Sequence, residues 1–180
     1  MRSAIFQILA LVMVVSLLFT ACGETTPPPA ASEILSSMLT VMTETAQPLP
    51  DGVIRLTAAP DDSPNGLTAT LFSALYGEAA RGLLRNETTT SPPVQDAALF
   101  LSVAPYPCEL GVFRCTDEGT AQEVAALCRG RLDTLSRGFS GSEYESIASG
   151  GRVVVAGNWV FLALCEDPGT VLEVARGMTR

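Results

Sequence analysis

The chain of 180 residues contains no histidine and no lysine, so all 11 of its basic residues are arginines. Histidine and lysine supply the general base, the Schiff-base amine or the metal ligand in most familiar catalytic sites. Their absence excludes serine–histidine–aspartate and cysteine–histidine nucleophiles, serine–lysine pairs, Schiff bases and histidine-bound metals within this chain. A glycine-rich phosphate loop and a close CxxC pair are also missing, so the sequence predicts neither a cofactor nor a metal site.

Acidic residues outnumber the arginines by 19 to 11, which gives a formal net charge of -8. The arginines are dispersed singly, and the nearest approach to a cluster is Arg129 with Arg131. On a helix, residues two positions apart do not share a face. Because neutralisation of phosphates needs clustered cations, we expect no nucleic-acid partner.

The N-terminus has the pattern of a signal peptide, since Arg2 precedes an almost wholly apolar stretch over residues 4–21. The stretch ends in Leu18-Phe19-Thr20-Ala21-Cys22-Gly23, which resembles the lipobox recognised by lipoprotein diacylglyceryl transferase and signal peptidase II. The resemblance implies a signal peptide at 1–21, cleavage before Cys22 and a diacylglycerol thioether on its sulfur. Two or three acyl chains give stable anchoring. We therefore expect a protein anchored by lipid in the cell membrane on the extracytoplasmic side; an uncleaved transmembrane helix is the alternative that the length permits.

Residues 22–32 form the predicted lipidated tether, which is rich in threonine and proline. In an extended polyproline form of ~3.1 Å per residue, the tether would span roughly 30 Å. The remaining residues, 33–180, have the length of one ordinary domain and enough apolar side chains to bury a core. We expect them to form a single α+β domain.

Hydrophobic periodicity predicts helices that alternate with strand hairpins over this domain. Ser32 is the expected N-cap of the first helix, and Gly157-Asn158 suits the positive φ angles of a tight hairpin turn. The predicted helices cover 32–46, 67–76 with an extension to 84, 119–136 and 169–177; the predicted strands cover 53–57, 97–103, 108–115, 152–156 and 159–165. This order predicts an α+β fold with an antiparallel-rich sheet of two hairpins (ββαββα) and helices packed on one face.

The domain also resembles a bacterial lipoprotein family designated domain of unknown function 4358. The residues that carry the resemblance are Leu75-Tyr76-Gly77, Glu109-Leu110-Gly111-Val112-Phe113, Arg131-Leu132, Phe139, Glu143-Tyr144-Glu145 and Gly157-Asn158-Trp159-Val160. Trp159 stands where the family more often has tyrosine. The family has no assigned activity, so the resemblance implies a fold and an envelope location but no reaction.

Carboxylates are the remaining candidates for catalysis, because a glycosidase needs two acids roughly 5 to 10 Å apart. Glu143 and Glu145 lie in a polar stretch where solvated charges are expected. Glu109 begins an apolar strand and is expected to cap a sheet edge or to pair with an arginine such as Arg131. Glu109, Arg131 and Trp159 are the predicted functional surface, and no catalytic residue is predicted.

Two functions from different classes are compatible with these patterns. The sequence favours a noncatalytic module that binds a ligand, an envelope protein or a wall component. The alternative is a carboxylate-dependent hydrolase that acts on a cell-wall polysaccharide.

Four cysteines remain besides Cys22, and an oxidising exterior makes them disulfide candidates. Cys108 and Cys115 would end one extended strand more than ~20 Å apart, beyond the ~7 Å that a bridge allows. If the following helix runs back along this strand, Cys128 lies toward the Cys108 end, and the last hairpin returns Cys165 there. The sequence predicts that any disulfide joins two of Cys108, Cys128 and Cys165.

Overall fold

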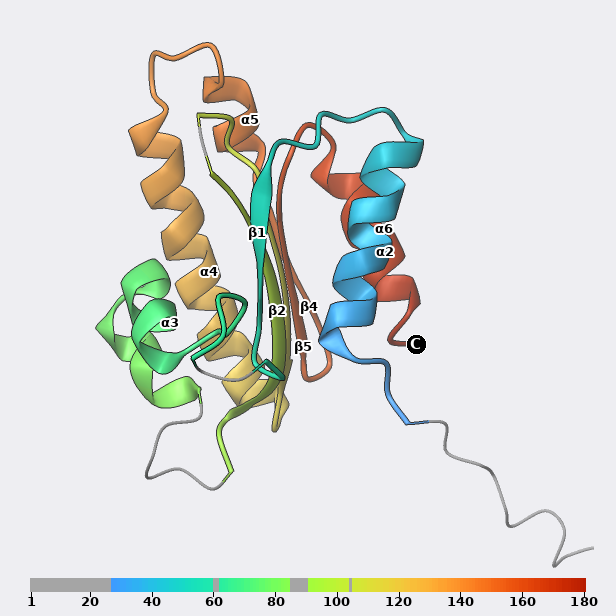
Figure 1. Cartoon of the computed structure of the whole chain (residues 1–180), viewed down its shortest axis with the longest axis vertical. Helices are drawn as coiled ribbons and strands as arrows, with labels where there is room; N and C mark the ends of the chain where they lie inside the picture. Colours follow the sequence, from blue (N-terminus) through green and yellow to red (C-terminus); the bar gives the residue numbers. More distant parts are fainter. Residues whose placement is uncertain (1–26, 60–61, 85–90, 104) are drawn as a thin grey trace, which may run out of the picture.

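A computed structural model describes residues 27–59, 62–84, 91–103 and 105–180. The predicted signal peptide and Cys22 lie outside the described residues. Five antiparallel strands form one sheet in the order β1-β2-β3-β5-β4, with helices on both sides (Figure 1). Within the described ranges, no helix is both long enough and apolar enough to cross a membrane.

Two hairpins and an edge strand make up the sheet. The strands are β1 (Gly52–Leu56), β2 (Val94–Ser102), β3 (Glu109–Cys115), β4 (Arg152–Ala156) and β5 (Trp159–Leu164). The second hairpin turns at Gly157, whose φ of 60° lies in the left-handed region that glycine adopts without strain. The two hairpins meet where β3 pairs with β5, with Glu109 opposite Leu164. The predicted α+β class and the antiparallel sheet of two hairpins in the order ββαββα are confirmed.

The helices cover both faces of the sheet. They are α2 (Ala31–Glu44), α3 (Ala69–Tyr76), the 3₁₀ helix η1 (Glu78–Leu83), α4 (Glu118–Gly138), α5 (Glu145–Gly150) and α6 (Pro168–Gly177). Helices α2 and α6 pack on one face, and α3, α4 and α5 lie on the other (Figure 1). The prediction that the helices pack on one face was therefore wrong. Its physical reason is visible in β5, where every residue is buried, because a strand covered on both faces has a continuous apolar sequence.

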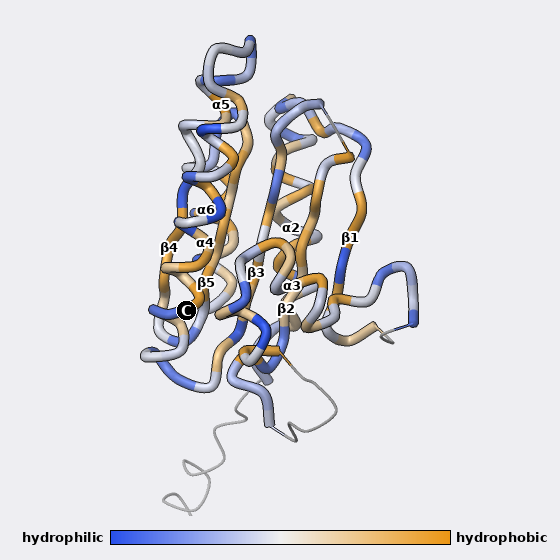
Figure 2. The backbone as a smooth tube through the Cα atoms, turned by 90° about the vertical axis from the view of Figure 1, so that its left-hand side faces the viewer, coloured by the Kyte–Doolittle hydropathy of each residue, from blue (hydrophilic) through white to orange (hydrophobic). Residues whose placement is uncertain are grey.

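Alternate residues of the strands supply two separate cores. On the α2/α6 face, Phe161 packs among residues that include Ile34, Met38 and Val171. On the α3/α4 face, Phe113 packs among residues that include Phe72 and Val124. Apolar residues, orange in Figure 2, run along the strands between the two helical layers. Since side chains of successive residues in a strand point to opposite faces, each central strand contributes to both cores.

Helix α2 begins earlier than the local sequence predicts, with Ala30 and not Ser32 at the N-cap. The backbone N–H of Ala31 donates to Oδ2 of Asp96 in β2, at 2.8 Å, and Glu33 accepts a hydrogen bond from the N–H of Ala30. A carboxylate from a strand 65 residues away thus satisfies the helix N-terminus. Ala31 is fully buried, so the folded part starts inside the predicted tether and before residue 33.

Candidate functional site

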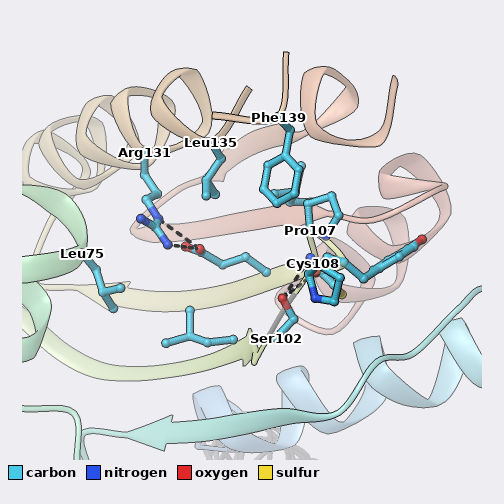
Figure 3. A pocket seen from close by; sticks show the side chains of 12 residues that line it. Leu75, Ser102, Pro107, Cys108, Arg131, Leu135 and Phe139 are labelled. Carbon is cyan, nitrogen blue, oxygen red and sulfur yellow. Dashed lines mark hydrogen bonds and ion pairs between the residues drawn. The ribbon is translucent and has the colours of Figure 1, made fainter. Parts of the chain in front are cut away.

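A pocket of about 390 Å³ opens on the α3/α4 face of the sheet, beside the connection from β2 to β3 (Figure 3). This volume lies within the range of small-molecule sites. Apolar side chains make up most of its wall, and they come from two helices, three strands and the connection. The lining residues are Leu75, Leu101, Ser102, Pro105, Tyr106, Pro107, Cys108, Glu109, Arg131, Leu135, Phe139 and Leu164.

An ion pair between Glu109 and Arg131 lies in the pocket wall (Figure 3). Nε and Nη2 of Arg131 both donate to Oε2 of Glu109, at 3.1 and 3.0 Å. The Glu109 side chain is 4% exposed and that of Arg131 is 22% exposed. Glu109 stands at the first position of β3 and points toward α4, which presents Arg131 to it. The carboxylate is therefore paired and buried, and the guanidinium reaches the surface of the pocket.

Tyr76, the last residue of α3, is hydrogen-bonded to the other oxygen of this carboxylate. Its hydroxyl donates to Oε1 of Glu109 at 3.1 Å, and both groups are buried. The tyrosine ring is held by Phe72 and Phe113, whose ring centroids lie 4.8 and 5.9 Å from its own. Burial, followed by the negative charge of Glu109, raises the pKa of Tyr76 well above its usual value, so the hydroxyl remains a donor.

The arrangement fixes the carboxylate but leaves hydrogen-bond donors on the guanidinium. Both oxygens of Glu109 already accept hydrogen bonds from Tyr76 and Arg131. Arginine carries five N–H donors, and among the described residues Arg131 uses two of them. The remaining donors, at a side chain that is partly exposed in the pocket, can bind an acceptor group of a ligand.

Ser102 shapes the edge of the pocket at the β2–β3 connection. Its hydroxyl donates to the carbonyl oxygen of Tyr106 at 2.7 Å and accepts from the backbone N–H of Cys108 at 3.3 Å. One side chain thus holds both ends of the connection in place. Val103, which follows Ser102 directly, is 59% exposed and adds apolar surface beside the pocket.

Comparisons with protein families, with curated proteins and with solved structures find no match for this chain. Membership of the lipoprotein family that the sequence resembles therefore stays a prediction.

The structure brings two of the three predicted surface residues together. Glu109 and Arg131 form the ion pair that the sequence suggested, whereas Trp159 lies at the far end of β5 and in the core of the α2/α6 face. Trp159 is 5% exposed, and its ring stacks on Phe161 with centroids 6.2 Å apart and lies 5.9 Å from the guanidinium carbon of Arg114. Trp159 is a packing residue and does not belong to the pocket.

The acids that were candidates for catalysis do not lie together at this site. Glu143 and Glu145 are exposed, and Glu145 accepts a hydrogen bond from the backbone N–H of Gly141 at 3.0 Å in the turn before α5. Glu109 is the one acid among the described residues that line the pocket. In the part of the chain that the structure describes, no cluster of acids and cysteines could hold a metal ion.

The sheet separates the cysteines into two pairs, all four of which are buried thiols in the structure. Cys108 and Cys165 belong to the core under α2 and α6, and Cys115 and Cys128 belong to the opposite core. The sequence predicts Cys128 near Cys108 along the strand direction, but it does not indicate the face of the sheet on which either thiol lies. Of the three pairs left open, only Cys108 with Cys165 keeps both thiols on one side of the sheet.

Several pocket residues were not expected in a site, among them Leu135 and Phe139 at the C-terminal end of α4 and Leu75 in α3. One signal could have found part of this set. Arg131, Leu135 and Phe139 are spaced four residues apart, so they lie on the same side of a helix. An arginine followed at this spacing by two large apolar residues indicates a mixed surface, and the pairing of Glu109 with Arg131 would have located it.

Proposed function

We propose that this protein is an extracytoplasmic lipoprotein, anchored in the cell membrane through a lipid on Cys22, that binds an envelope protein or a wall component without catalysis. The pocket beside the Glu109–Arg131 pair is the proposed binding site. The observation that supports it most is the combination of a predominantly apolar wall with one partly exposed guanidinium. Apolar pockets with a few placed polar groups are the common form of ligand sites.

The pocket lies at the end of the fold away from the point where the chain enters it. Helix α2 starts beside Asp96, near the beginning of β2, whereas Ser102 at the end of β2 lines the pocket. Six residues of strand at ~3.4 Å each place these ends about 20 Å apart. In Figure 1, α2 begins at the lower end and the β2–β3 connection lies at the upper end. A lipid attached ahead of α2 would leave the pocket free for a partner.

The chemistry of the pocket favours a ligand with an apolar body and one hydrogen-bond acceptor. Leu75, Leu135 and Phe139 offer apolar contact, and Arg131 offers donors for a carbonyl or a carboxylate. An apolar peptide segment meets both requirements, because each of its residues carries a backbone carbonyl. Exposed Val103 extends the apolar contact beyond the pocket.

The geometry gives less support to the hydrolase alternative. A glycosidase needs a second acid within about 10 Å and a carboxyl group that can exchange a proton with the substrate. Glu109 has both oxygens engaged and no acidic neighbour among the described pocket residues. The direct check is wall-polysaccharide hydrolysis by the wild type and by the Glu109→Gln, Glu143→Gln and Glu145→Gln variants. Turnover that one of these substitutions abolishes would establish the hydrolase and refute the binding module.

Cross-linking in intact cells with identification of the captured partner tests the binding proposal. The informative variant is Leu135→Arg, which places a long charged side chain in the pocket. The matched control is Ala126→Arg, an exposed position on the same helix. We expect the wild type and the control to recover the same envelope partner. The amount of this partner recovered with Leu135→Arg should be at least ten-fold lower. Undiminished recovery by a folded Leu135→Arg variant would place the binding site elsewhere.

The anchor is tested separately from the pocket. The Cys22→Ala precursor is expected to lose lipid labelling and globomycin-sensitive processing, since the lipobox supplies the lipid attachment site. Unchanged labelling in this variant would contradict the proposed anchor and leave the pocket to be judged by cross-linking alone.

A further inference from the structure

Cys108 and Cys165 are opposite each other across the central pair of strands. The register of β3 with β5 pairs Glu109 with Leu164, Leu110 with Ala163, and so on along the ladder. One step beyond the Glu109–Leu164 pair, the same register places Cys108 opposite Cys165. Each cysteine thus lies one residue outside its strand, at the same end of the ladder.

Both thiols also point to the same face of the sheet. In β3, Leu110 and Val112 contribute to the core under α2 and α6, and Cys108 continues this alternation. In β5, Phe161 and Ala163 do the same, and Cys165 continues theirs. Cys108 is 2% exposed and Cys165 is 1% exposed, so the two side chains share a small buried volume.

The hydrogen-bond pattern shows which kind of cross-strand pair these residues form. The N–H of Cys115 donates to the carbonyl oxygen of Asn158 at 2.8 Å, which makes that pair hydrogen-bonded. Hydrogen-bonded and non-hydrogen-bonded pairs alternate in an antiparallel ladder. Counting seven steps from Cys115 to Cys108 gives a non-hydrogen-bonded pair. The carbonyl oxygen of Cys108 independently supports this, because it accepts from the N–H of Ser102 in β2 and so points away from β5.

Non-hydrogen-bonded pairs bring the two Cα atoms to about 4.5 Å, and disulfides occur at Cα separations of about 4.4 to 6.8 Å. The position, the face and the spacing therefore all suit a bridge. We propose that Cys108 and Cys165 form a cross-strand disulfide in the exported protein, while Cys115 and Cys128 remain thiols. The proposal rests on the proposed extracytoplasmic location, where an oxidant is present.

Formation of the bridge breaks two S–H bonds and makes one S–S bond, with loss of two protons and two electrons. The oxidant is the disulfide of an envelope thiol–disulfide oxidoreductase, which accepts the electrons and the protons and leaves as a dithiol. Burial raises the pKa of Cys108 and of Cys165 to about 12, so few thiolates exist in the folded protein at neutral pH. Oxidation is therefore expected before α2 and α6 close over the pair, and the finished bridge is shielded from reductants.

The disulfide would fasten the two hairpins to each other beside the pocket. Cys108 ends the β2–β3 connection and lines the pocket, and Leu164, next to Cys165, lines it too. The bridge belongs to the opposite face of the sheet, so it holds the pocket wall in place without occupying the pocket.

Peptide mapping without reduction tests the proposal on the full mature lipoprotein, extracted from the membrane in detergent and unfolded in denaturant while its free thiols are alkylated at neutral pH. A second sample of the same protein is unfolded, reduced, and allowed to refold with glutathione disulfide. We expect one bridged peptide pair, Cys108 with Cys165, in both samples, and alkylated Cys115 and Cys128. Alkylated Cys108 and Cys165 in both samples, or a bridge from either residue to Cys128 or Cys115, would overturn the proposal.

The same maps distinguish failure of the disulfide from failure of the anchor. A Cys22 peptide that is alkylated and carries no lipid would contradict the proposed anchor, whereas the refolded sample reports on the Cys108–Cys165 pair regardless of location. Reductant should lower the urea midpoint of the wild type and of Cys115→Ser, but not that of Cys108→Ala or Cys165→Ala. A midpoint that reductant leaves unchanged in the wild type would also count against the bridge.

Discussion

The two faces of the sheet are built from the same strands but differ in what they bury. Under α2 and α6 the side chains from the strands are almost all apolar, with Phe161 and Trp159 among them. Under α3 and α4 the core has a similar size but also encloses the carboxylate of Glu109, which Tyr76 and Arg131 hold by hydrogen bonds. The pocket opens on this second face.

The difference shows how one sheet can carry an apolar core on one face and a fixed polar cluster beside a pocket on the other. A buried charge costs free energy unless it is paired and hydrogen-bonded, so Glu109 imposes a fixed position on Tyr76 and Arg131. Two residues of this fixed polar set, Glu109 and Arg131, line the otherwise mostly apolar pocket. The α2/α6 face has no such requirement and contributes packing stability.

The largest expected effect is on the packing face. Phe161→Ala removes a fully buried ring from under α2 and α6 and should lower the free energy of unfolding by about 3–5 kcal/mol. The pocket on the other face should retain the proposed partner under conditions where the variant is folded. Urea unfolding combined with in-cell cross-linking checks both parts. A stability loss below about 1 kcal/mol would mean that this core is poorly packed.

Breaking the ion pair is expected to have the next largest effect. Arg131→Ala leaves the carboxylate of Glu109 buried without its cation and should cost about 3 kcal/mol of unfolding free energy, at the lower end for a buried pair because Arg131 is partly exposed. Arg129→Ala, at an exposed position of the same helix, is the control and should change stability by less than about 0.5 kcal/mol. Equal losses of unfolding free energy in the two variants would show that the Glu109–Arg131 pair contributes no more than an ordinary charge on the helix surface.

Removal of the tyrosine hydroxyl should have a smaller effect. Tyr76→Phe keeps the ring between Phe72 and Phe113 and removes one donor to a buried carboxylate, which should cost about 1.5–3 kcal/mol. Tyr144→Phe, at a half-buried tyrosine outside this network, serves as the control for the loss of a hydroxyl. Chemical denaturation of both variants is the measurement. The role assigned to Tyr76 would be wrong if its substitution were as mild as that of Tyr144.

Acid should affect the two faces alike, because an aspartate is the N-cap of one helix on each face, Asp117 for α4 and Asp167 for α6. Hydrogen bonds from the backbone N–H of Thr120 and from the hydroxyls of Thr116 and Thr120 lower the pKa of Asp117 below its usual value, and hydrogen bonds from Thr170 do the same for Asp167. A carboxyl group whose pKa is lower in the folded state than in the unfolded state stabilises the fold at pH values above its unfolded pKa. That contribution is lost as the pH falls through the lowered value.

The urea midpoint should therefore drop between pH 5 and pH 2, and drop less in Asp117→Asn or Asp167→Asn, which cannot titrate. Asp133→Asn, at an exposed position of α4 with no hydrogen bond to its side chain among the described residues, is the control and should follow the wild type. If the urea midpoint of both cap variants drops with acid as much as that of the wild type, these two carboxylates are not the source of the drop.

The sequence was sufficient to predict most elements of the fold, because helical and alternating periodicities and the Gly157-Asn158 turn are local signals. It failed where a distant residue decides the outcome. Asp96, and not the adjacent Ser32, supplies the N-terminal partner of α2. The two-sided burial of β5 is also set by its neighbours, although its unbroken apolar sequence carried a hint.

The candidate site was predictable only in part, for the same reason. The pairing of Glu109 with Arg131 could be suspected because an acid begins an apolar strand and an arginine lies on the following helix, and the structure shows the pair. Trp159 was predicted to belong to the functional surface but lies in the packing core, since the face of a strand residue depends on register. Tyr76 joins the network through a contact 33 residues away in sequence, which no local pattern reveals.

The most direct test of the proposed function compares photo-cross-linking from the two faces in intact cells. A photoreactive phenylalanine analogue at Phe139 reports on the pocket, and the same analogue at Thr40, an exposed position of α2, reports on the packing face. We expect a discrete cross-linked envelope partner from position 139 and only background from position 40. Background labelling from position 139, or a discrete partner from position 40 alone, would contradict it.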